Sequence, residues 1–526
     1  MLSIDEKRQH NLGLPISCIP KEILLKIFSH SRNNYIGEGR HHGTECLNGW
    51  IGITYVCHEW REMSLNDSLL WCHIDILHSL RSWIPEQLRR SKQSPLTVVV
   101  IESVAQHAYD LLVQVHEHFC RVRELVLDNP RLDTWNQIFL SYNTQSLEAL
   151  EIYLSGQRSF VLNDTYLRGE GFRRLILHNC PVDWNSKWFL GLTHLKLVDM
   201  PDDCKLGCHD FKVILSKIPA LETLHLYQIF REEEHVQTHH PTKVHLRHLQ
   251  QLDVDHEIPE MAQFLSYLLV PRSCKLRITT GIDASDEFCA IVSWVSNQLR
   301  VPAPSLSILD TSGHEQYIRS FHLTYNPDMM EFELQGFCDV LSHEGLITAD
   351  PILKFIITES DADDTFDFNL TSFLSLLPLS GVVFLDVYAD LDVFPSPEFW
   401  TVPFGSIQTL TTAHLEAETS AFWEALIPVN SNDGTVKSLP FSALVSVTVD
   451  DSQLDPQILL DKLRVRSELF GTQLQELRFL RRGCVPPAPL MIQLKELVPN
   501  LRVAGTLDPY GSTNADDRSF NGDDED

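Results

Sequence analysis

The sequence lacks a hydrophobic run long enough to cross a membrane. No uninterrupted apolar segment reaches the length of about 20 residues that a spanning helix needs. The first thirty residues show no basic head followed by an apolar run and a small-residue cleavage site. The cysteines, spread from Cys18 to Cys484, have no paired spacing. These absences predict reduced thiols and a protein of the cytosol or nucleus.

Basic residues are scarce relative to acidic ones. The chain has 42 Lys and Arg against 71 Asp and Glu, so its formal net charge is −29. This balance disfavours a general affinity for nucleic-acid phosphate or for an anionic membrane. Part of the charge lies in residues 508–526, where acidic residues stand among Gly, Ser and Asn. We expect that segment to be a disordered acidic tail.

Short catalytic motifs are also missing. No Gly-x-Ser-x-Gly elbow, His-Glu-x-x-His pair or P-loop occurs, and Gly37-Glu38-Gly39 lacks the third glycine of a dinucleotide cradle. We therefore expect no catalytic residues and no cofactor. A hydrolase hidden in an α/β fold, built from residues distant in the sequence, stays open as an alternative.

Two segments contain metal-binding residue types without the full spacing of a site. Asp361, Asp363 and Asp367 lack the glycine and closing glutamate of a calcium loop. The run Cys204-x3-Cys208-His209 has no second pair of ligands nearby, as zinc sites require. We interpret both as ordinary surface loops, and we expect no metal site.

The most strongly patterned stretch runs from Ile19 to Trp71. Ile23 and Ile27, like Leu24 and Phe28, are four residues apart and lie on one apolar stripe of a helix that begins near Pro20. In the second half, apolar residues recur at three-and-four spacing and predict a second amphipathic helix. Two short helices this rich in Ile, Phe and Trp cannot bury all of it, so some should face a partner.

The order of these residues resembles the F-box, a small three-helix module that docks substrate receptors onto the Skp-type adaptor of cullin-RING (SCF) ubiquitin ligases. The resemblance rests on Pro20-x-Glu22-Ile23-Leu24-x-x-Ile27-Phe28, Val56-Cys57-x-x-Trp60-Arg61 and a closing Leu70-Trp71. The long segment 31–49 has loop composition. The style of the chain is similar to the divergent F-box families of mushroom-forming fungi. The resemblance implies that the following residues face or brace the adaptor: Pro20, Ile23, Leu24, Ile27, Phe28, Val56, Cys57 and Trp60.

Past Trp71 an LxxLxL pattern recurs. Six instances end at residues 127, 152, 177, 197, 226 and 254, which are 25, 25, 20, 29 and 28 residues apart. This spacing is typical of leucine-rich repeats, and the same pattern continues less regularly to residue 503. We therefore predict an α/β solenoid, a curved leucine-rich-repeat-like array over residues 73–507. It would follow a flexible segment 1–16 and an F-box-like helical module 17–72 with an insertion at 31–49. The alternative is a doubly wound α/β domain.

Side chains alternate along a strand, so the residues between the leucines should form an outward row. A row that mixes aromatics, histidine and both charges suits a protein ligand. The predicted substrate-binding residues are Glu151, Tyr153, His178, Lys196, His225, Tyr227 and Asp253.

These expectations combine into one function. The resemblance implies the substrate-recognition subunit of an SCF ubiquitin ligase, whose partners are the Skp-type adaptor with its cullin-RING ligase and a protein substrate. Such a chain is not itself an enzyme, because it acts by bringing the substrate close to a bound conjugating enzyme. The alternative is a non-catalytic leucine-rich-repeat scaffold or inhibitor that engages no ligase.

Overall fold

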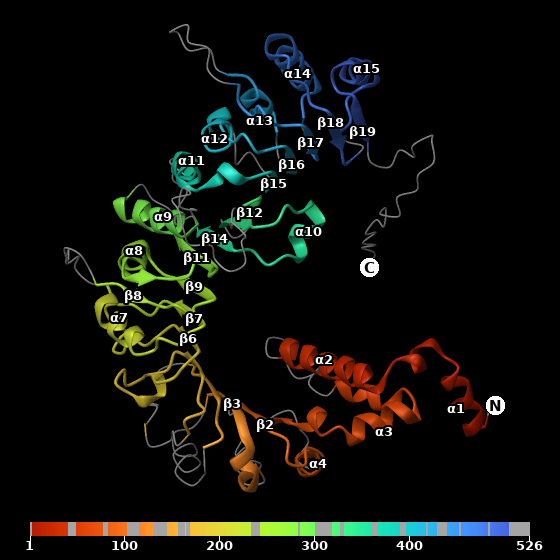
Figure 1. Cartoon of the computed structure of the whole chain (residues 1–526), viewed down its shortest axis with the longest axis vertical. Helices are drawn as coiled ribbons and strands as arrows, with labels where there is room; N and C mark the ends of the chain where they lie inside the picture. The colour runs from red at the N-terminus through yellow and green to blue at the C-terminus, as the bar shows by residue number, and fades with distance from the viewer. Residues whose placement is uncertain are drawn as a thin grey trace, which may run out of the picture. The chain divides into compact units, whose positions relative to one another are not determined.

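The computed structural model divides the chain into two compact units, Met1–Arg231 and Glu232–Asp526, called here the first and second units (Figure 1). The boundary lies inside the range 73–507 that was predicted as one array. The structure describes residues 3–39, 49–76, 83–101, 115–129, 145–155, 164, 169–232, 242–281, 285–299, 318–326, 331–358, 366–389, 396–416, 419–428, 439–451, 454–481 and 484–503. The predicted acidic tail, Asp361 and Asp363 lie outside the described residues, and Asp367, predicted to be in a surface loop, lies at the start of helix Phe366–Leu376.

The predicted leucine-rich-repeat-like solenoid is wrong. The structure shows an α/β fold with a large, mostly parallel sheet of 17 strands. The LxxLxL segments do lie on strands, because alternating apolar residues need one buried face. That spacing does not determine how consecutive strands connect. In the second unit β13 runs antiparallel to both neighbours, so the sheet does not grow by repeating one unit.

The first unit begins with a helical module, defined here as residues 3–72. Its helices are α1 Ile4–Leu12, α2 Lys21–Gly39 and α3 His58–Asn66, with 3-10 turns η1 Pro15–Cys18, η2 Gly49–Tyr55 and η3 Ser68–Trp71. The segment 1–16, predicted to be flexible, contains α1, whose Ser3 and Glu6 form a capping box. The predicted second helix is divided into η2 and α3.

Seven parallel strands follow in the first unit, in chain order. They are β1 His73–Asp75, β2 Leu96–Ile101, β3 Val122–Asp128, β4 Ala149–Tyr153, β5 Arg174–His178, β6 His194–Val198 and β7 Thr223–Tyr227. Their connections contain α4 Trp83–Arg90, η4 His116–Arg121, η6 Lys187–Phe189 and α7 Cys208–Ser216. The leucines of the pattern are the buried positions: Leu175 and Leu177 of β5 are fully buried while their neighbours are partly exposed.

The second unit has a different strand order, β9-β11-β14-β13-β12-β15-β16-β17-β18-β19. The strands are β9 Gln251–Asp255, β11 Lys275–Gly281, β12 Ser320–Asn326, β13 Glu331–Phe337, β14 Leu353–Thr358, β15 Phe384–Ala389, β16 Thr412–Glu416, β17 Ser446–Val449, β18 Glu476–Phe479 and β19 Asn500–Val503. A separate parallel pair joins β8 Val244–His245 and β10 Leu268–Leu269.

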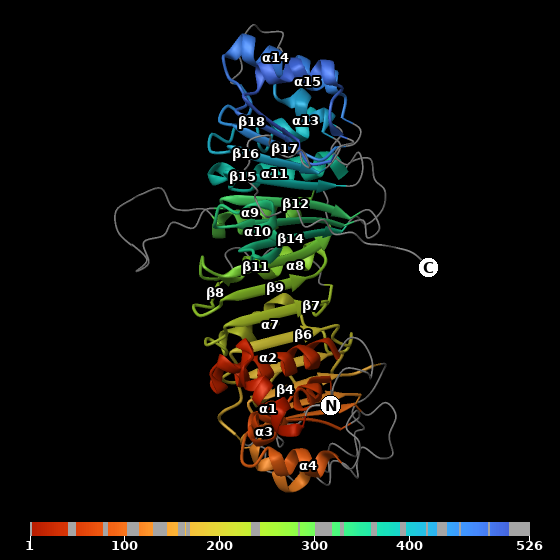
Figure 2. The same cartoon turned by 90° about the vertical axis from the view of Figure 1, so that its right-hand side faces the viewer.

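The helices of the second unit are not shared equally between the two faces of its strands. They are α8 Ile258–Ser266, α9 Asp286–Leu299, α10 His343–Thr348, α11 Phe366–Leu376, α12 Pro397–Thr401, α13 Ser420–Ala425, α14 Pro456–Phe470 and α15 Ala488–Leu497, with the 3-10 turn η7 Leu379–Gly381. Figure 1 shows α10 on the face opposite α8, α9 and α11 to α15, and Figure 2 shows the strands side by side behind α10. One face of this sheet is therefore largely left to polar side chains.

Helix α14 has clear start and stop signals and contains a buried cation. Asp455 accepts a hydrogen bond from the Gln457 backbone, and Gly471 ends the helix with φ of 63°, which favours glycine. Between them, the Arg466 side chain donates to the carbonyls of Leu426 at 3.0 Å and Pro440 at 2.9 Å, and to that of Phe441. Burial lowers the pKa of Arg466 to about 10. The guanidinium thus ties α14 to the connection that precedes β17.

None of the helices in the described part of the chain is both long enough and apolar enough to cross a membrane.

We predict that Arg466→Met lowers the free energy of unfolding by about 2–4 kcal/mol, because two buried carbonyls and a partly buried one lose a charged donor. Arg464→Met is the matched control on the same helix, since Arg464 contacts only the partly exposed side chain of Gln493 in the described hydrogen bonds. Urea unfolding followed by circular dichroism measures both variants. Equal stability of the two would contradict the assigned role of Arg466.

Candidate functional site

The helical module has its own buried core. Leu24, Phe28, Trp50, Leu70 and Trp71 form this cluster. The Trp71 indole donates to the Ser64 carbonyl at 2.8 Å, and its ring lies 5.2 Å from that of Trp50. Leu24 and Phe28 come from one side of α2, as their spacing of four predicts. The inner side of the predicted apolar stripe is therefore filled.

The rest of the predicted stripe remains exposed. Ile23 is 44% exposed and Ile27 48%, one turn apart on α2, and Val56 is 60% exposed just before α3. An ion pair of 3.4 Å between Lys21 and Glu59 joins the start of α2 to α3. We call Ile23, Ile27 and Val56 the apolar face. Branched apolar side chains this exposed on helices that already have a core are a feature of protein-docking surfaces.

The other predicted adaptor residues support this face from behind. Trp60 packs against Phe28 with ring centroids 4.9 Å apart. The Cys57 sulfur caps α3 by accepting from the Trp60 backbone at 3.5 Å. The Pro20 carbonyl accepts from Ile23 and Leu24 at the start of α2. Leu24, Phe28, Cys57, Trp60 and Pro20 thus hold the helices in place, whereas Ile23, Ile27 and Val56 are available to a partner.

A shallow groove lies along the neighbouring side of α2. Its volume is about 490 Å³. It is lined by Glu22, Leu25, Lys26, Ser29, His30, Asn33, Asp67 and Leu69. The mixed lining of charge, amide and leucine extends the surface that a partner could contact beyond the apolar face.

The segment 31–49, predicted as a loop, is partly helical. Helix α2 continues to Gly39, and residues 40–48 lie outside the described part of the chain. Near Ser31 the Arg32 side chain donates to Asn33 and to the Leu69 carbonyl, which holds the middle of α2 against η3. The described part of this segment, residues 31–39, therefore belongs to α2 and lengthens that helix.

The module packs directly on α4 and on the turn that precedes β2. The Arg90 guanidinium lies 4.9 Å from the Trp71 ring and donates to the Leu65 carbonyl at 3.2 Å. The hydroxyls of Ser68 and Ser94 are 2.7 Å apart. Trp83 stacks on Trp71 at 6.1 Å. A partner on the apolar face would consequently be oriented with respect to the sheet of the first unit.

The predicted recognition row of the first unit is brought together by strand register. Lys196 lies opposite His225 on the neighbouring strand, and its ammonium is 5.3 Å from the Tyr227 ring. The rings of Tyr153 and His178 are 6.1 Å apart. These five residues are partly exposed and form what we call the polar row.

Two predicted recognition residues are buried, although strand alternation places them on the outward side. Glu151 is buried, with Arg174 at 3.4 Å and the Tyr153 hydroxyl at 3.1 Å from its carboxylate. Asp253, in the second unit, is also buried, with Arg277 at 3.9 Å. The prediction for Glu151 and Asp253 as contact residues is therefore corrected. Long neighbours on the next strand cover short carboxylates, which alternation alone does not reveal.

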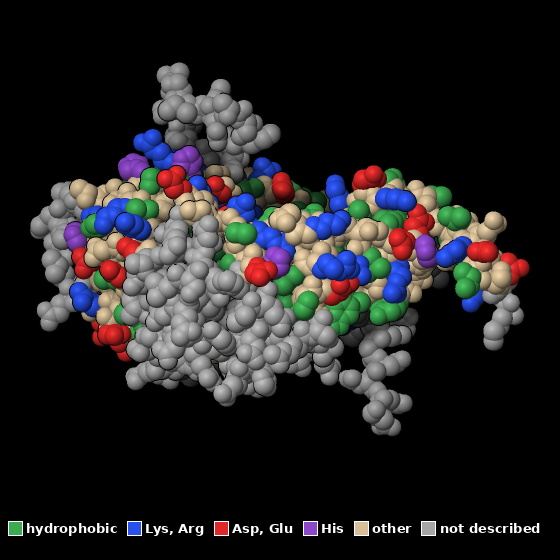
Figure 3. All heavy atoms as spheres, turned by 90° about the horizontal axis from the view of Figure 1, so that it is seen from below, with side chains coloured by type: hydrophobic (Ala, Val, Ile, Leu, Met, Phe, Trp, Pro, Cys, Tyr) green, Lys and Arg blue, Asp and Glu red, His purple; other side chains and the backbone are tan. Residues whose placement is uncertain are grey.

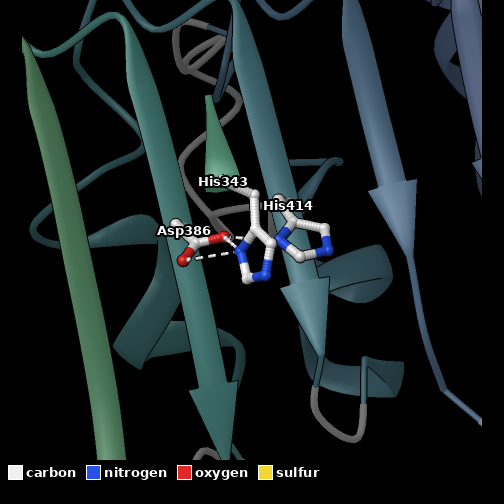
Figure 4. A group of neighbouring side chains, drawn as sticks. All are labelled: His343, Asp386 and His414. Atoms are coloured by element: carbon white, nitrogen blue, oxygen red, sulfur yellow. Dashed lines mark hydrogen bonds and ion pairs between the residues drawn. The ribbon is translucent and has the colours of Figure 1, made fainter. Parts of the chain in front are cut away.

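A second group of functional residue types lies on the α10 side of the second unit. Asp386 on β15 is almost fully buried, and three imidazoles converge on it. His343, the first residue of α10, has Nδ1 3.1 Å from Asp386 Oδ1, and His414 on β16 hydrogen-bonds the same oxygen. His322 on β12 hydrogen-bonds Oδ2. Figure 4 shows His343 and His414 pointing to Asp386 from different elements.

The electrostatics of this group favour a charged carboxylate. Burial raises the pKa of Asp386, but hydrogen bonds from His322 and His414 and their positive charge outweigh it and hold the pKa far below its ordinary value. Burial and the neighbouring Asp450 raise the pKa of Glu416, two residues after His414. The site thus combines a stable anion, three imidazoles and a nearby carboxyl of increased basicity.

Sequence reasoning did not find this group. His343 and His414 are 43 and 28 residues from Asp386, so no short motif contains them. The signal that existed is the alignment of β12, β15 and β16, which places His322, Asp386 and His414 opposite one another. Among the described residues, the structure does not assemble three metal-binding groups at Cys204, Cys208 and His209.

Exposed charges of both signs are interspersed on the face shown in Figure 3, in agreement with a surface suited to mixed polar contacts.

No protein-family model matches the chain, and no curated protein sequence matches it.

An ion pair beside the His322 strand gives a pH-dependent test. The Lys354 ammonium lies 2.6 Å from the Glu333 carboxylate. The side-chain amide of Gln335, which lies opposite His322, also donates a hydrogen bond to this carboxylate. Burial raises the pKa of Glu333, but Lys354 and Gln335 outweigh it and leave the pKa below 4.5. The stabilisation is therefore present above about pH 4.5 and is lost as the pH falls through the lowered pKa.

We predict that Glu333→Gln lowers the free energy of unfolding by about 1–2 kcal/mol at pH 7. The difference from the wild type should shrink as the pH falls below about 4.5. Glu331→Gln, two residues earlier on β13, is the control, and urea unfolding at pH 7, 5 and 3.5 measures both. A difference that stays constant over this pH range would contradict the assigned ion pair.

Proposed function

We propose that the chain is the substrate-recognition subunit of an SCF ubiquitin ligase. In this function the helical module docks on a Skp-type adaptor, and the polar side of the sheet binds a protein substrate. The observation that carries the proposal is the apolar face of Ile23, Ile27 and Val56. These three residues belong to the segment whose residue order resembles an F-box. Their branched side chains are exposed on α2 and just before α3, although the module has its own core.

The division of labour within the module supports this function. Leu24, Phe28 and Trp71 fill the core, so Ile23 and Ile27 are not needed to complete it. Full burial of an exposed Ile or Val side chain contributes about 1.5–3 kcal/mol, and Ile23, Ile27 and Val56, which are about half exposed, would contribute roughly half of that each. The charged residues near them, Lys21 and Glu59, suit the polar rim that surrounds such contacts.

The polar row supports the second half of the proposal. Tyr153 and Tyr227 offer aromatic anchors, and Lys196 and His178 provide donors beside them. Aromatic side chains flanked by polar groups are typical of the residues that dominate protein recognition. The chain would act by proximity, because holding the substrate near a bound conjugating enzyme raises its effective concentration. No covalent step on this chain is required.

The compartment follows from the same proposal. The adaptor and its cullin act in the cytosol and nucleus, as the resemblance implies. The described cysteines are free thiols, including buried Cys72, Cys180 and Cys274. Free buried thiols agree with a reducing environment.

The double variant Ile23→Asp with Val56→Asp tests the docking face. Both positions are exposed, so the core should remain folded while the charges weaken adaptor binding. We expect at least about a 30-fold loss of affinity, as for the loss of an interface hot spot of about 2 kcal/mol. The measurement is titration of the purified chain with a Skp-type adaptor in a surface-binding assay.

The matched control is Val213→Asp on α7, because Val213 is 44% exposed like Ile23 but lies outside the module. It should bind the adaptor as the unmodified chain does. Trp60→Ala is less suitable, since Trp60 packs on Phe28 and its loss would disturb the core. If the unmodified chain does not bind the adaptor, the ligase function fails and a non-catalytic scaffold or inhibitor becomes the better description.

A further inference from the structure

The group around Asp386 has the composition and arrangement of a metal centre. His343, Asp386 and His414 each present one ligand atom, and these atoms all lie within 4.8 Å of one another. Within the described part of the chain, no other group of three His, Cys, Asp or Glu residues meets this condition. In a tetrahedral zinc site with bonds of about 2.0–2.1 Å, ligand atoms are about 3.3 Å apart. The distance of 3.1 Å from His343 Nδ1 to Asp386 Oδ1 is already close to this spacing, and the directly hydrogen-bonded His414 Nδ1 and Asp386 Oδ1 would move apart to admit an ion.

We propose that His343, Asp386 and His414 bind a divalent first-row transition metal, with Zn²⁺ as the representative ion. Two imidazoles and one carboxylate suit zinc, cobalt, nickel or iron better than magnesium or calcium, which prefer oxygen ligands. This inference does not depend on the proposed ligase function, because it rests on residues of the second unit alone.

The convergence on a single oxygen is the first argument. Both His343 Nδ1 and His414 Nδ1 are directed at Asp386 Oδ1, and the two rings meet edge to face with centroids 4.3 Å apart. An ion between them replaces the two Nδ1–H donors. An imidazole that binds the ion through Nδ1 keeps one proton on Nε2, and a doubly protonated ring releases its Nδ1 proton to solvent. Neutral imidazole and ionised carboxylate are the forms that bind metals.

The surroundings supply the second argument. The side chains of Asp386 and His414 are 1% and 5% exposed, whereas that of His343 is 41% exposed. The site thus has a buried floor and an open side at His343, through which an ion can enter. Three protein ligands also leave at least one coordination position for water or for an atom of a bound molecule. Helix α10, which begins with His343, lies on the face of the strands opposite most helices of the second unit (Figure 1).

His322 has a positioning role. It hydrogen-bonds Asp386 Oδ2, the oxygen that His414 does not use, and its side chain is 18% exposed. Such a partner orients a ligating carboxylate and leaves Oδ1 directed at the ion. His322 also belongs to β12, whose pairing with β15 fixes it opposite Asp386. The ion would link α10 to the paired strands β15 and β16.

The test is a metal titration of the full chain after treatment with a chelator and its removal. Co²⁺ reports ligand type by its visible absorption, and Zn²⁺ displaces it. We expect a Co²⁺ spectrum of nitrogen and oxygen ligation, without the sulfur-to-metal bands that cysteine sites produce. Zn²⁺ should also raise the midpoint of thermal unfolding, because it binds the folded state, and Mg²⁺ at the same concentration should not compete.

His343→Gln and His414→Gln should each abolish this spectrum and lower the number of Co²⁺ ions bound per chain by one. His343 is partly exposed, so His343→Gln should fold normally, as circular dichroism in the absence of metal will show. His322→Gln should keep the stoichiometry and weaken binding by about 10–100-fold, as outer partners of metal ligands do. His245→Gln, at an exposed position of β8, is the control and should bind as the unmodified chain.

The proposal is overturned if His343→Gln and His414→Gln bind Co²⁺ with the stoichiometry and spectrum of the unmodified chain. It is also overturned if the Co²⁺ spectrum shows sulfur ligation, or if the unmodified chain binds no Co²⁺ or Zn²⁺. In the last case the three histidines and Asp386 form a polar network that serves the sheet alone. None of these outcomes depends on adaptor binding, so the metal site and the ligase function fail separately.

Discussion

Side-chain alternation on parallel strands is the constraint on which both units depend. In a parallel sheet each strand is followed by a crossover connection. Where the crossover helices cover one face, the side chains that point to that face are apolar and become buried. The opposite half of each strand is then available to polar side chains. In β5 this separates Leu175 and Leu177 from Ile176 and His178, and in β15 it separates Leu385 and Val387 from Asp386. In both units, burial of the apolar strand residues on one face therefore places the candidate functional residues on the other face.

Strand register converts this alternation into sites. Residues that are far apart in sequence become direct neighbours at matched positions, such as Lys196 with His225 and Asp386 with His414. In the first unit the resulting neighbours are mixed in charge and partly exposed, which suits recognition of a protein. In the second unit the same geometry concentrates imidazoles around one buried carboxylate, which suits an ion. One architectural rule thus supports two different kinds of chemistry, in regions that the proposals treat separately.

The helical module obeys a different constraint, the limited size of its own core. Leu24, Phe28 and the surrounding tryptophans fill the inner side of α2, and within the described module Ile23, Ile27 and Val56 remain 44%, 48% and 60% exposed. Arg90 of α4 packs on Trp71 and attaches the module to that helix. Trp71, which belongs to the core beneath the surface that we assign to the adaptor, thus also contacts α4.

The sequence by itself determined the local features of this protein. The spacing of Ile23, Leu24, Ile27 and Phe28 predicted a helix with one apolar stripe, and the LxxLxL spacing predicted where strands such as β5 and β6 lie. These patterns depend on residues within one or two turns of chain, so they can be read without tertiary information. Only the tertiary structure decided that the strands form a large mixed sheet instead of a solenoid, that Glu151 and Asp253 are covered, and that His322, His343 and His414 meet at Asp386. Strand order and register join residues dozens of positions apart, and the local periodicity of a sequence contains no record of that pairing.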